Sequence, residues 1–332
     1  MNDLYIAGVG VYLPPRETAA EAIAAGRYDP ETARTDQVLS ACVEPKLFPA
    51  EMAAAAGRAA MDMAGDRIGA VRAVFHSYVD YQRARYWQAA PYVALHTVGT
   101  SVPSFDVVQE CNGMMASIEI GRRFVTGPDD AVLVTSGDRF DNPWVKRWYG
   151  DQSVLGDGGS ALLLSGARGF ARVTSLVTLA ENSLEAEARG DTFSTGADLS
   201  VVDFDQMRKR FHNTAVPMLE HYARMQTLLH ECIGEALTGA GVDADQLAYV
   251  VPVVTTRWRV EVQMERFIGL PIERSTWDFG RTTGHVGTGD QAIGLHHLVT
   301  TGKLRLGDQV LLLGGGTGYT LTAAVIEIVE DI

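Results

Sequence analysis

The stretch Ser104-Phe-Asp-Val-Val-Gln-Glu-Cys-Asn-Gly-Met-Met-Ala-Ser-Ile-Glu-Ile-Gly-Arg-Arg-Phe-Val, residues 104 to 125, decides the fold class. Its first part, Phe105 to Val108, is rich in the residues that favour a buried β-strand. Its second part has apolar residues such as Met114 and Ile118 at helical spacing, which predicts an amphipathic helix. Cys111 falls where strand becomes helix, and the helix dipole there favours a thiolate. Cys111 is therefore a candidate nucleophile; simple packing, the role of most free cysteines, is the alternative.

Composition and charge limit the function classes. The chain has 332 residues with 46% hydrophobic content, enough for two domains or two fused halves. A net charge of −13 argues against binding to nucleic acid or an anionic membrane surface. The three cysteines give no disulfide framework, and we find neither a signal segment nor an apolar run of ~18 residues. We therefore expect a cytoplasmic protein that binds neither nucleic acid nor membrane.

Hydrophobic patterns outside this stretch alternate between strands and helices. We predict strands at 4–13, 71–78, 131–135, 160–164, 246–254 and 321–328, and helices at 50–64, 214–240 and 259–268. The polar segment 182–214 is interpreted as a connection between halves. Gly8 and Gly10 lack the third glycine of a dinucleotide-binding fingerprint. This alternation predicts an α/β protein with mainly parallel, buried sheets.

Two segments share one pattern, which indicates an internal duplication. Residues 111–137 contain a helix, Thr-Gly, Asp and then Ala-Val-Leu-Val-Thr-Ser-Gly; residues 285–316 contain a helix, Thr-Gly, Gly-Asp and then Gln-Val-Leu-Leu-Leu-Gly-Gly-Gly. We therefore predict two similar halves, residues 1–170 and 171–332. In such a fold the two helix starts face each other. Counted from Thr-Gly, the position that matches Cys111 falls at about Val286, beside His285.

This duplication makes His285 a candidate base for Cys111. His285 lies in Gly284-His-Val-Gly-Thr-Gly-Asp290, whose glycines suit a tight turn close to a ligand. Asp290 could orient the imidazole as the third member of a Cys-His-Asp relay, although helix capping would explain it equally well. The stretch Gly314-Gly-Gly-Thr-Gly318 precedes a strand and not a helix. Its backbone N–H groups, with that of Cys111, could form an oxyanion hole.

Several motifs, in the same order over nearly the whole chain, resemble β-ketoacyl-acyl-carrier-protein synthase III. They are Cys111 at its turn, Gly156-Asp-Gly-Gly, the strand ending in Val251-Pro252, and the glycine triplet before the last strand. The resemblance implies a thiolase fold, with duplicated βαβαβ halves in α-β-α-β-α layers, and a homodimer. The family's catalytic residues are a Cys, a His and an Asn. Here Val253 stands at the His position and His285 at the Asn position, while Gly316 or Thr317 matches the oxyanion glycine.

This departure implies a change of reaction. Decarboxylative condensation needs two neutral donors for the enolate oxygen, and Val253 offers none. The pattern resembles the acyltransferase branch of the family, found in natural-product pathways such as polyketide and antibiotic biosynthesis, which uses Cys-His-Asp. We predict that Cys111 takes an acyl group from an acyl-carrier-protein or coenzyme A thioester and passes it to a small hydroxyl, amine or thiol acceptor. The alternatives are a decarboxylating synthase that uses Thr256 or water, and a non-catalytic partner subunit; we expect no metal or bound cofactor.

Basic and aromatic side chains are candidates for contacting the donor and acceptor. The basic residues of an otherwise acidic chain could bind a carrier protein or a phosphopantetheine phosphate, although solvated charge is an equally good explanation. They cluster at Arg208, Lys209, Arg210, Arg257 and Arg259. Trp87 and Trp148 could offer flat surfaces to a substrate, with core packing as the alternative.

Overall fold

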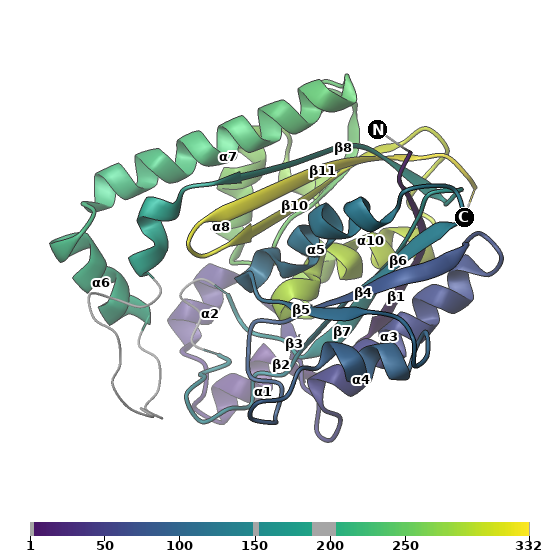
Figure 1. Ribbon diagram of the computed structural model, residues 1–332. Helices are drawn as coiled ribbons and strands as arrows, with labels where there is room; N and C mark the ends of the chain where they lie inside the picture. Colours follow the sequence, from purple (N-terminus) through teal and green to yellow (C-terminus); the bar gives the residue numbers. More distant parts are fainter. Residues whose placement is uncertain (1–2, 149–152, 188–203, 332) are drawn as a thin grey trace.

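In the computed structural model, which describes residues 3–148, 153–187 and 204–331, the strands form two groups (Figure 1). The first has the order β5-β4-β6-β7-β1 and the second β8-β11-β10-β9. The groups join only where β1 meets β8 at two residue pairs, which makes one nine-stranded sheet. The strands are β1 Tyr5–Tyr12, β4 Ala70–Ser77, β5 Ser104–Val107, β6 Asp130–Asp138, β7 Gly158–Ser165, β8 Ala171–Ala180, β9 Leu247–Val251, β10 Gln309–Gly316 and β11 Thr320–Ile328.

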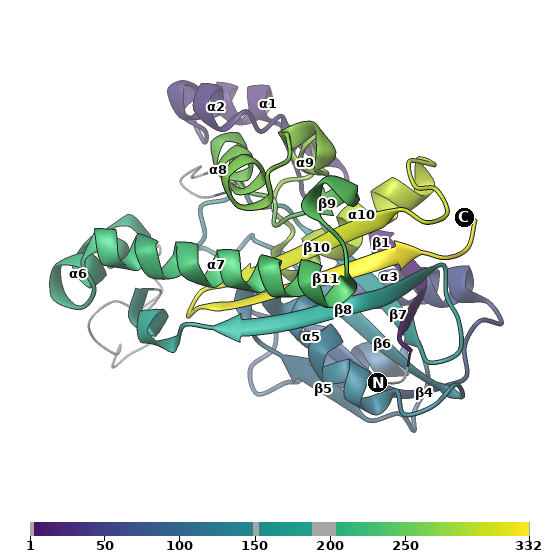
Figure 2. The same cartoon turned by 90° about the horizontal axis from the view of Figure 1, so that it is seen from above.

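Helices form three layers around these strands. Helices α3 Pro49–Ala64 and α4 Ala90–Leu95 lie on the outer side of the first group. Helix α7 Met218–Ala240 runs along β8 and β11 on the outer side of the second group (Figure 2). Helices α5 Gly113–Gly121 and α10 Asp290–Thr300 lie between the groups and contact strands of both (Figure 1). This is the predicted α-β-α-β-α layering.

Smaller elements connect or flank these layers. They are β2 Arg16–Thr18, β3 Ser40–Cys42, α1 Ala19–Ala24, α2 Pro30–Asp36, α6 Phe204–Thr214, α8 Arg257–Val262, α9 Trp277–Gly280, the 3₁₀ turns η1 Glu110–Asn112, η2 Arg122–Phe124, η3 Asn182–Glu187, η4 Ala244–Gln246, η6 Ile272–Arg274 and η7 Gly287–Gly289, and a π-helical turn at Gln263–Ile268. No helix within the described residues is long and apolar enough to cross a membrane.

The order of elements repeats along the chain. The order β1-α3-β4-β5-α5-β6-β7 is matched by β8-α7-β9-α10-β10-β11. The first half pairs β4 with β5, for example Val74 with Ser104. At the corresponding place in the second half, β9 has only one isolated parallel bridge, between Val250 and Ser275. Strand β8 begins directly after the predicted boundary at residue 170, and the division into two halves at that residue stays a prediction.

The prediction of mainly parallel sheets is wrong. Strand β4 is parallel to β5 and β6, and β9 is parallel to β10, but the remaining ladders are antiparallel. Within the described residues, no helix connects β6 to β7 or β10 to β11, and each second strand returns antiparallel to the first.

Two further elements differ from the sequence prediction. Strand β8, whose residues are mostly half-buried, was not predicted. The connection expected over residues 182–214 contains η3 and α6, and the rest of it lies outside the described residues.

Close packing fills the space between the layers. Helix α5 is apolar on nearly every side, and Met114, Met115 and Ile118 are buried against strands of both groups. A Cβ atom on Gly10 would lie 2.1 Å from the carbonyl oxygen of Ala56. Gly10 therefore lets α3 approach the sheet closely.

Candidate active site

Cys111 lies in the turn η1, between β5 and α5, and is half-buried. The residue before it, Glu110, has φ +49°, a left-handed conformation that costs energy for a residue other than glycine. Such a strained strand-to-helix turn is a known way to hold a nucleophile away from its own helix. The sequence prediction of a cysteine at a strand-to-helix turn is therefore confirmed.

His285 reaches Cys111 from the second half of the chain. The backbone of His285 pairs with that of Leu155 in an isolated parallel β-bridge, and the His285 side chain is only 4% exposed. The Nε2 atom of His285 lies 2.9 Å from the Sγ atom of Cys111. The predicted proximity of the two residues is thus present, and their catalytic roles stay a prediction.

Asp290, the first residue of α10, fixes the other side of the imidazole. The Nδ1–H group of His285 donates to Oδ2 of Asp290 at 2.6 Å. The same carboxylate accepts from the N–H groups of Val254 at 2.7 Å and Val286 at 2.8 Å, and Asp290 is buried. Because these two amides hold the carboxylate in place, Asp290 assigns the ring proton to Nδ1 and directs Nε2 toward the sulfur.

The charges at this contact favour a protonated imidazole. Burial by itself opposes a charge on His285, but the negative charges of Cys111 and Asp290 and their hydrogen bonds raise its pKa well above the usual value. A protonated imidazole next to a cysteine sulfur is the arrangement that activates catalytic cysteines in general. Burial raises the pKa of the Glu110 carboxyl group, and its electrostatic interaction with His285 acts in the opposite direction.

The two central helix starts face each other. A Cβ atom on Gly113 would lie 2.7 Å from Cγ2 of Thr288, so α5 and η7 touch. In the structure, Cys111 is the middle residue of η1 before α5, and Thr288 is the middle residue of η7 before α10. The structural counterpart of Cys111 is therefore Thr288 and not Val286. His285 reaches the sulfur because it precedes that turn in an extended segment.

Asp138, at the end of β6, is a buried residue of the site that the sequence analysis missed. Its carboxylate accepts from the N–H groups of Val79 at 2.8 Å, Asp80 at 3.1 Å and Thr288 at 3.2 Å. Burial raises its pKa to about 7, although these N–H groups act against the rise. Asp138 joins the loop after β4 to the turn before α10. The available signal was an acidic residue at the end of a buried apolar strand.

The glycine-rich end of β10 lies against the cysteine turn. A Cβ atom on Gly316 would lie 2.3 Å from the carbonyl oxygen of Gln109, two residues before Cys111. Thr317 follows in the turn between β10 and β11 and is half-buried. The backbone of this stretch thus approaches the sulfur segment, and an oxyanion hole made by Cys111, Gly316 and Thr317 stays a prediction.

The tryptophans singled out from the sequence differ in their surroundings. Trp148 is 4% exposed, packs on Tyr28 with ring centroids 5.1 Å apart, and donates from Nε1 to Glu17. It is a core residue, so the prediction that it offers a surface to the substrate is wrong. Trp87 is exposed beside Tyr92, and its contact with a substrate stays a prediction.

The basic residues lie on two different helices. Arg208 and Arg210 are on α6, whereas Arg257 begins α8. The guanidinium of Arg257 donates to Glu261 at 2.6 Å and lies over the ring of Trp277. Arg257 is therefore engaged within the chain, and contact of these arginines with a carrier protein or phosphate stays a prediction.

Comparison with protein families and solved structures gives a consistent result. Residues 237–328 match the model for the 3-oxoacyl-[acyl-carrier-protein (ACP)] synthase III C terminal. The solved structure of ChlB3, an acyltransferase, is 30% identical, with a TM-score of 0.92 over 99% of this chain and 98% of that chain. The synthase III of Aquifex aeolicus VF5 is 20% identical, with a TM-score of 0.80 over 98% and 99% of the two chains, and so shares the fold.

Two curated proteins are also similar to this chain in sequence. Beta-ketoacyl-[acyl-carrier-protein] synthase III 3 of Streptomyces coelicolor is 25% identical over 71% of this chain and 70% of that protein. The acetoacetyl CoA synthase NphT7 of Streptomyces sp. strain CL190 is 25% identical over 97% of this chain and 98% of that protein.

Proposed function

We propose that this chain, which belongs to the β-ketoacyl-acyl-carrier-protein synthase III-like enzymes of the thiolase superfamily, carries an acyl group on Cys111 and transfers it to oxygen, nitrogen or sulfur. Members of this family are acyl-group transferases that act on thioesters of acyl carrier protein or coenzyme A. The observation that carries the proposal is the relay in which His285 contacts Cys111 at 2.9 Å and Asp290 at 2.6 Å.

The first half-reaction loads the enzyme. The Cys111 thiolate attacks the carbonyl carbon of the donor thioester, and the resulting oxyanion is stabilised by backbone N–H groups at the cysteine turn and the glycine-rich turn. When the tetrahedral intermediate collapses, the C–S bond to the donor breaks. The departing thiolate takes the proton from Nε2 of His285, which leaves a neutral imidazole beside an acyl-cysteine.

The second half-reaction transfers the acyl group. Neutral His285 accepts the proton of the acceptor hydroxyl, amine or thiol as the acceptor attacks the acyl-cysteine carbonyl. Collapse of the second intermediate breaks the bond to Sγ of Cys111 and restores the thiolate–imidazolium pair. Asp290 stabilises the imidazolium and keeps Nε2 directed at the reacting atoms.

The chemistry of residue 253 separates this reaction from condensation. β9 ends at Val251, and the N–H of Val254 binds Asp290, so Val253 lies on the segment that adjoins the relay. A decarboxylating synthase must hold an enolate oxygen there, and a valine side chain has no donor. Loss of one such donor typically costs about 2.7 to 4 kcal/mol in the transition state. Acyl transfer to a heteroatom forms no enolate and avoids that cost.

A decarboxylating synthase is the second candidate. It is favoured by the names of relatives such as acetoacetyl CoA synthase NphT7. It is also favoured by Thr256, whose buried hydroxyl makes no hydrogen bond within the described part of the chain and could replace the missing donor. A non-catalytic partner subunit is less well supported, because such a subunit would not need the contact between Cys111 and His285.

The remaining parts of the proposal concern context. We place the enzyme in secondary-metabolite biosynthesis as a homodimer, with an acyl carrier protein or coenzyme A as donor and a small molecule as acceptor. The resemblance to the acyltransferase branch and the 30% identity to the acyltransferase ChlB3 support this placement.

Competition between acceptors tests the reaction type. The enzyme is loaded from a panel of acyl thioesters, and the acyl-enzyme is offered malonyl carrier protein beside small alcohols and amines, including aminosugars and cyclitols. An O- or N-acylated product without carbon dioxide release supports the proposal. Carbon dioxide release with a β-ketoacyl product would establish the synthase instead.

A further inference from the structure

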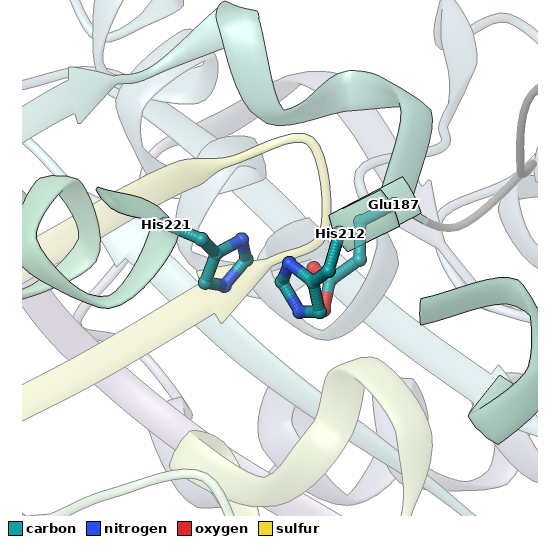
Figure 3. A group of neighbouring side chains, drawn as sticks. All are labelled: Glu187, His212 and His221. Carbon is teal, nitrogen blue, oxygen red and sulfur yellow. The ribbon is translucent and has the colours of Figure 1, made fainter. Parts of the chain in front are cut away.

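A second cluster of reactive side chains lies outside the active site, where η3, α6 and α7 meet. It consists of Glu187 at the end of η3, His212 on α6 and His221 on α7 (Figure 3). One ligand atom from each residue can be chosen such that all three lie within 4.8 Å of one another. Figure 3 shows both ring nitrogens of His221 on the side that faces His212 and Glu187. We propose that these three residues bind one divalent transition-metal ion of the zinc type.

The donor set matches that class of ion. Two imidazoles and one carboxylate are a known zinc set, which leaves a fourth position open. Calcium and magnesium prefer all-oxygen sites, so the two histidines argue against them. Zinc–ligand bonds of about 2.0 to 2.2 Å require ligand atoms about 3.3 Å apart, so the cluster has to close by roughly 1 to 1.5 Å. His212 is half-exposed and the Glu187 side chain is long, which allows this movement.

Hydrogen bonds leave the required lone pairs available. The Nδ1 atom of His212 lies 3.1 Å from the carbonyl oxygen of Val216. It therefore carries the proton and donates to that oxygen, which leaves Nε2 free to coordinate; metal-binding histidines commonly have such a partner. His221 is 5% exposed, and its Nδ1 atom is buried without a hydrogen-bond partner among the residues that the structure describes. A buried ring nitrogen without a partner is costly, and a metal ion would satisfy it.

The surroundings hold the cluster in place and supply charge. Leu184, Phe211 and Val216 form a small apolar core beside it. The hydroxyl of Tyr319 donates to Glu187, which orients the carboxylate. Arg208 acts electrostatically on His221 and opposes a cation, and the negative charge of Glu187 offsets it.

Binding there would connect three segments of the chain. The ion would join the end of η3 to α6 and α7. Through Glu187, which accepts from the hydroxyl of Tyr319, it would also reach the turn after Gly316 and Thr317. Two backbone hydrogen bonds with Glu181, at 2.8 and 3.1 Å, hold Tyr319 in that turn. The ion therefore has a structural role next to the proposed oxyanion turn and takes no part in acyl transfer.

Zinc content per chain tests the proposal. The measurement uses Cys111→Ala protein, because the thiolate and imidazole of the active site can themselves bind zinc. The protein is treated with EDTA, freed of chelator, dialysed against micromolar zinc, desalted and measured by mass spectrometry of the metal. We expect about one zinc per chain, and a higher midpoint of thermal unfolding in the presence of zinc.

Matched variants identify the ligands. In the same background, His212→Ala and Glu187→Gln should lower the zinc content at least tenfold and remove the thermal shift. His230→Ala, an exposed histidine on the same helix as His221, should keep both. Cobalt in place of zinc should give the visible absorption of a four-coordinate ion in the His230→Ala protein and lose it in the His212→Ala protein. A zinc content near zero before any change to the cluster, or one that His212→Ala does not lower although its circular dichroism is unchanged, would overturn the proposal.

Discussion

The starts of α5 and α10 occupy corresponding places in the repeated order of elements but present different chemistry. The first start holds Cys111 half-exposed, after a residue with left-handed backbone. The second start holds His285 and Asp290 at 4% and 3% exposure. Both are preceded by a 3₁₀ turn, and the two touch at Gly113 and Thr288.

This difference shows how two similar helix starts can carry different catalytic groups. A nucleophile has to meet a substrate, so it needs exposure and a turn that projects it. A base needs a fixed tautomer and a strong electrostatic partner, and burial beside a carboxylate provides both. The repeated fold brings the two helix starts close together, and the residues at each start determine its chemical role.

Removal of the base should have the largest effect. His285→Ala should slow acyl transfer at least 100-fold, because a positioned general base typically contributes that much. His296→Ala and His297→Ala, further along α10, serve as controls and should retain most of the rate. If one of those variants were inactive while His285→Ala remained active, the pairing of the two helix starts would be assigned wrongly.

Weakening the base without removing it should have a smaller effect. Asp290→Asn keeps an oxygen that can accept from the N–H groups of Val254 or Val286 but loses the charge that stabilises the imidazolium. The rate should fall, but by less than in His285→Ala, in single-turnover measurements with a pre-loaded acyl-enzyme. A greater loss than in His285→Ala would show that Asp290 has a function beyond orienting the ring.

Disturbing the contact between the helix starts should mainly affect stability. In Gly113→Ala the new methyl group would meet Thr288 at 2.7 Å and Ser77 at 2.9 Å. We expect a loss of about 1 to 3 kcal/mol in the free energy of unfolding in urea, as for other overpacked sites. Gly234→Ala on α7 is the matched control: its Cβ would meet nothing within 4 Å, so alanine should be neutral or stabilising. Equal effects at both positions would contradict a tight contact.

The smallest expected effect is the pH dependence of stability that comes from a buried histidine without an anionic partner. His76 bonds Thr135 and Gln82, and burial lowers its pKa to about 4. Between pH 6.5 and 4 the unfolded chain therefore binds a proton that the folded chain does not, so stability falls as the pH falls. His285 behaves oppositely: its stabilising contribution is complete below pH 6.5 and is lost as the pH rises through its raised value.

The His76 effect can be isolated by denaturation at two pH values. Between pH 7 and pH 6 it should lower the free energy of unfolding by less than about 1 kcal/mol. His76→Gln should reduce the difference between the two pH values by that amount. A variant in which stability depends more steeply on pH than in the wild type would contradict the assignment.

The contact between cysteine and histidine could be predicted from the sequence, because strong periodicity and glycine turns mark both helix starts. The duplicated pattern was enough to bring Cys111 and His285 together, even though Thr288 is the closer structural counterpart of Cys111. Long apolar strands and helices were enough to predict an α/β protein. The layered arrangement followed only from the resemblance to synthase III.

Other features depend on contacts that a linear pattern does not contain. Strand β8 is half-buried along most of its length, so it shows neither a continuous apolar run nor a clear alternation. Trp148 has the same composition signal whether it lines a pocket or packs on Tyr28. Glu187, His212 and His221 have no motif spacing, and only the packing of η3, α6 and α7 brings them together.

Mapping the acyl group on the loaded enzyme tests the central claim most directly. Burial raises the pKa of Cys42 and of Cys232 to about 11, so neither forms a nucleophile near neutral pH, whereas Cys111 contacts an imidazolium. After loading with an acyl thioester and proteolysis, mass spectrometry should find the acyl group on the peptide that contains residues 104–122, and Cys111→Ala protein should carry none. An acyl group on Cys42 or Cys232, or full turnover by Cys111→Ala protein, would contradict the account.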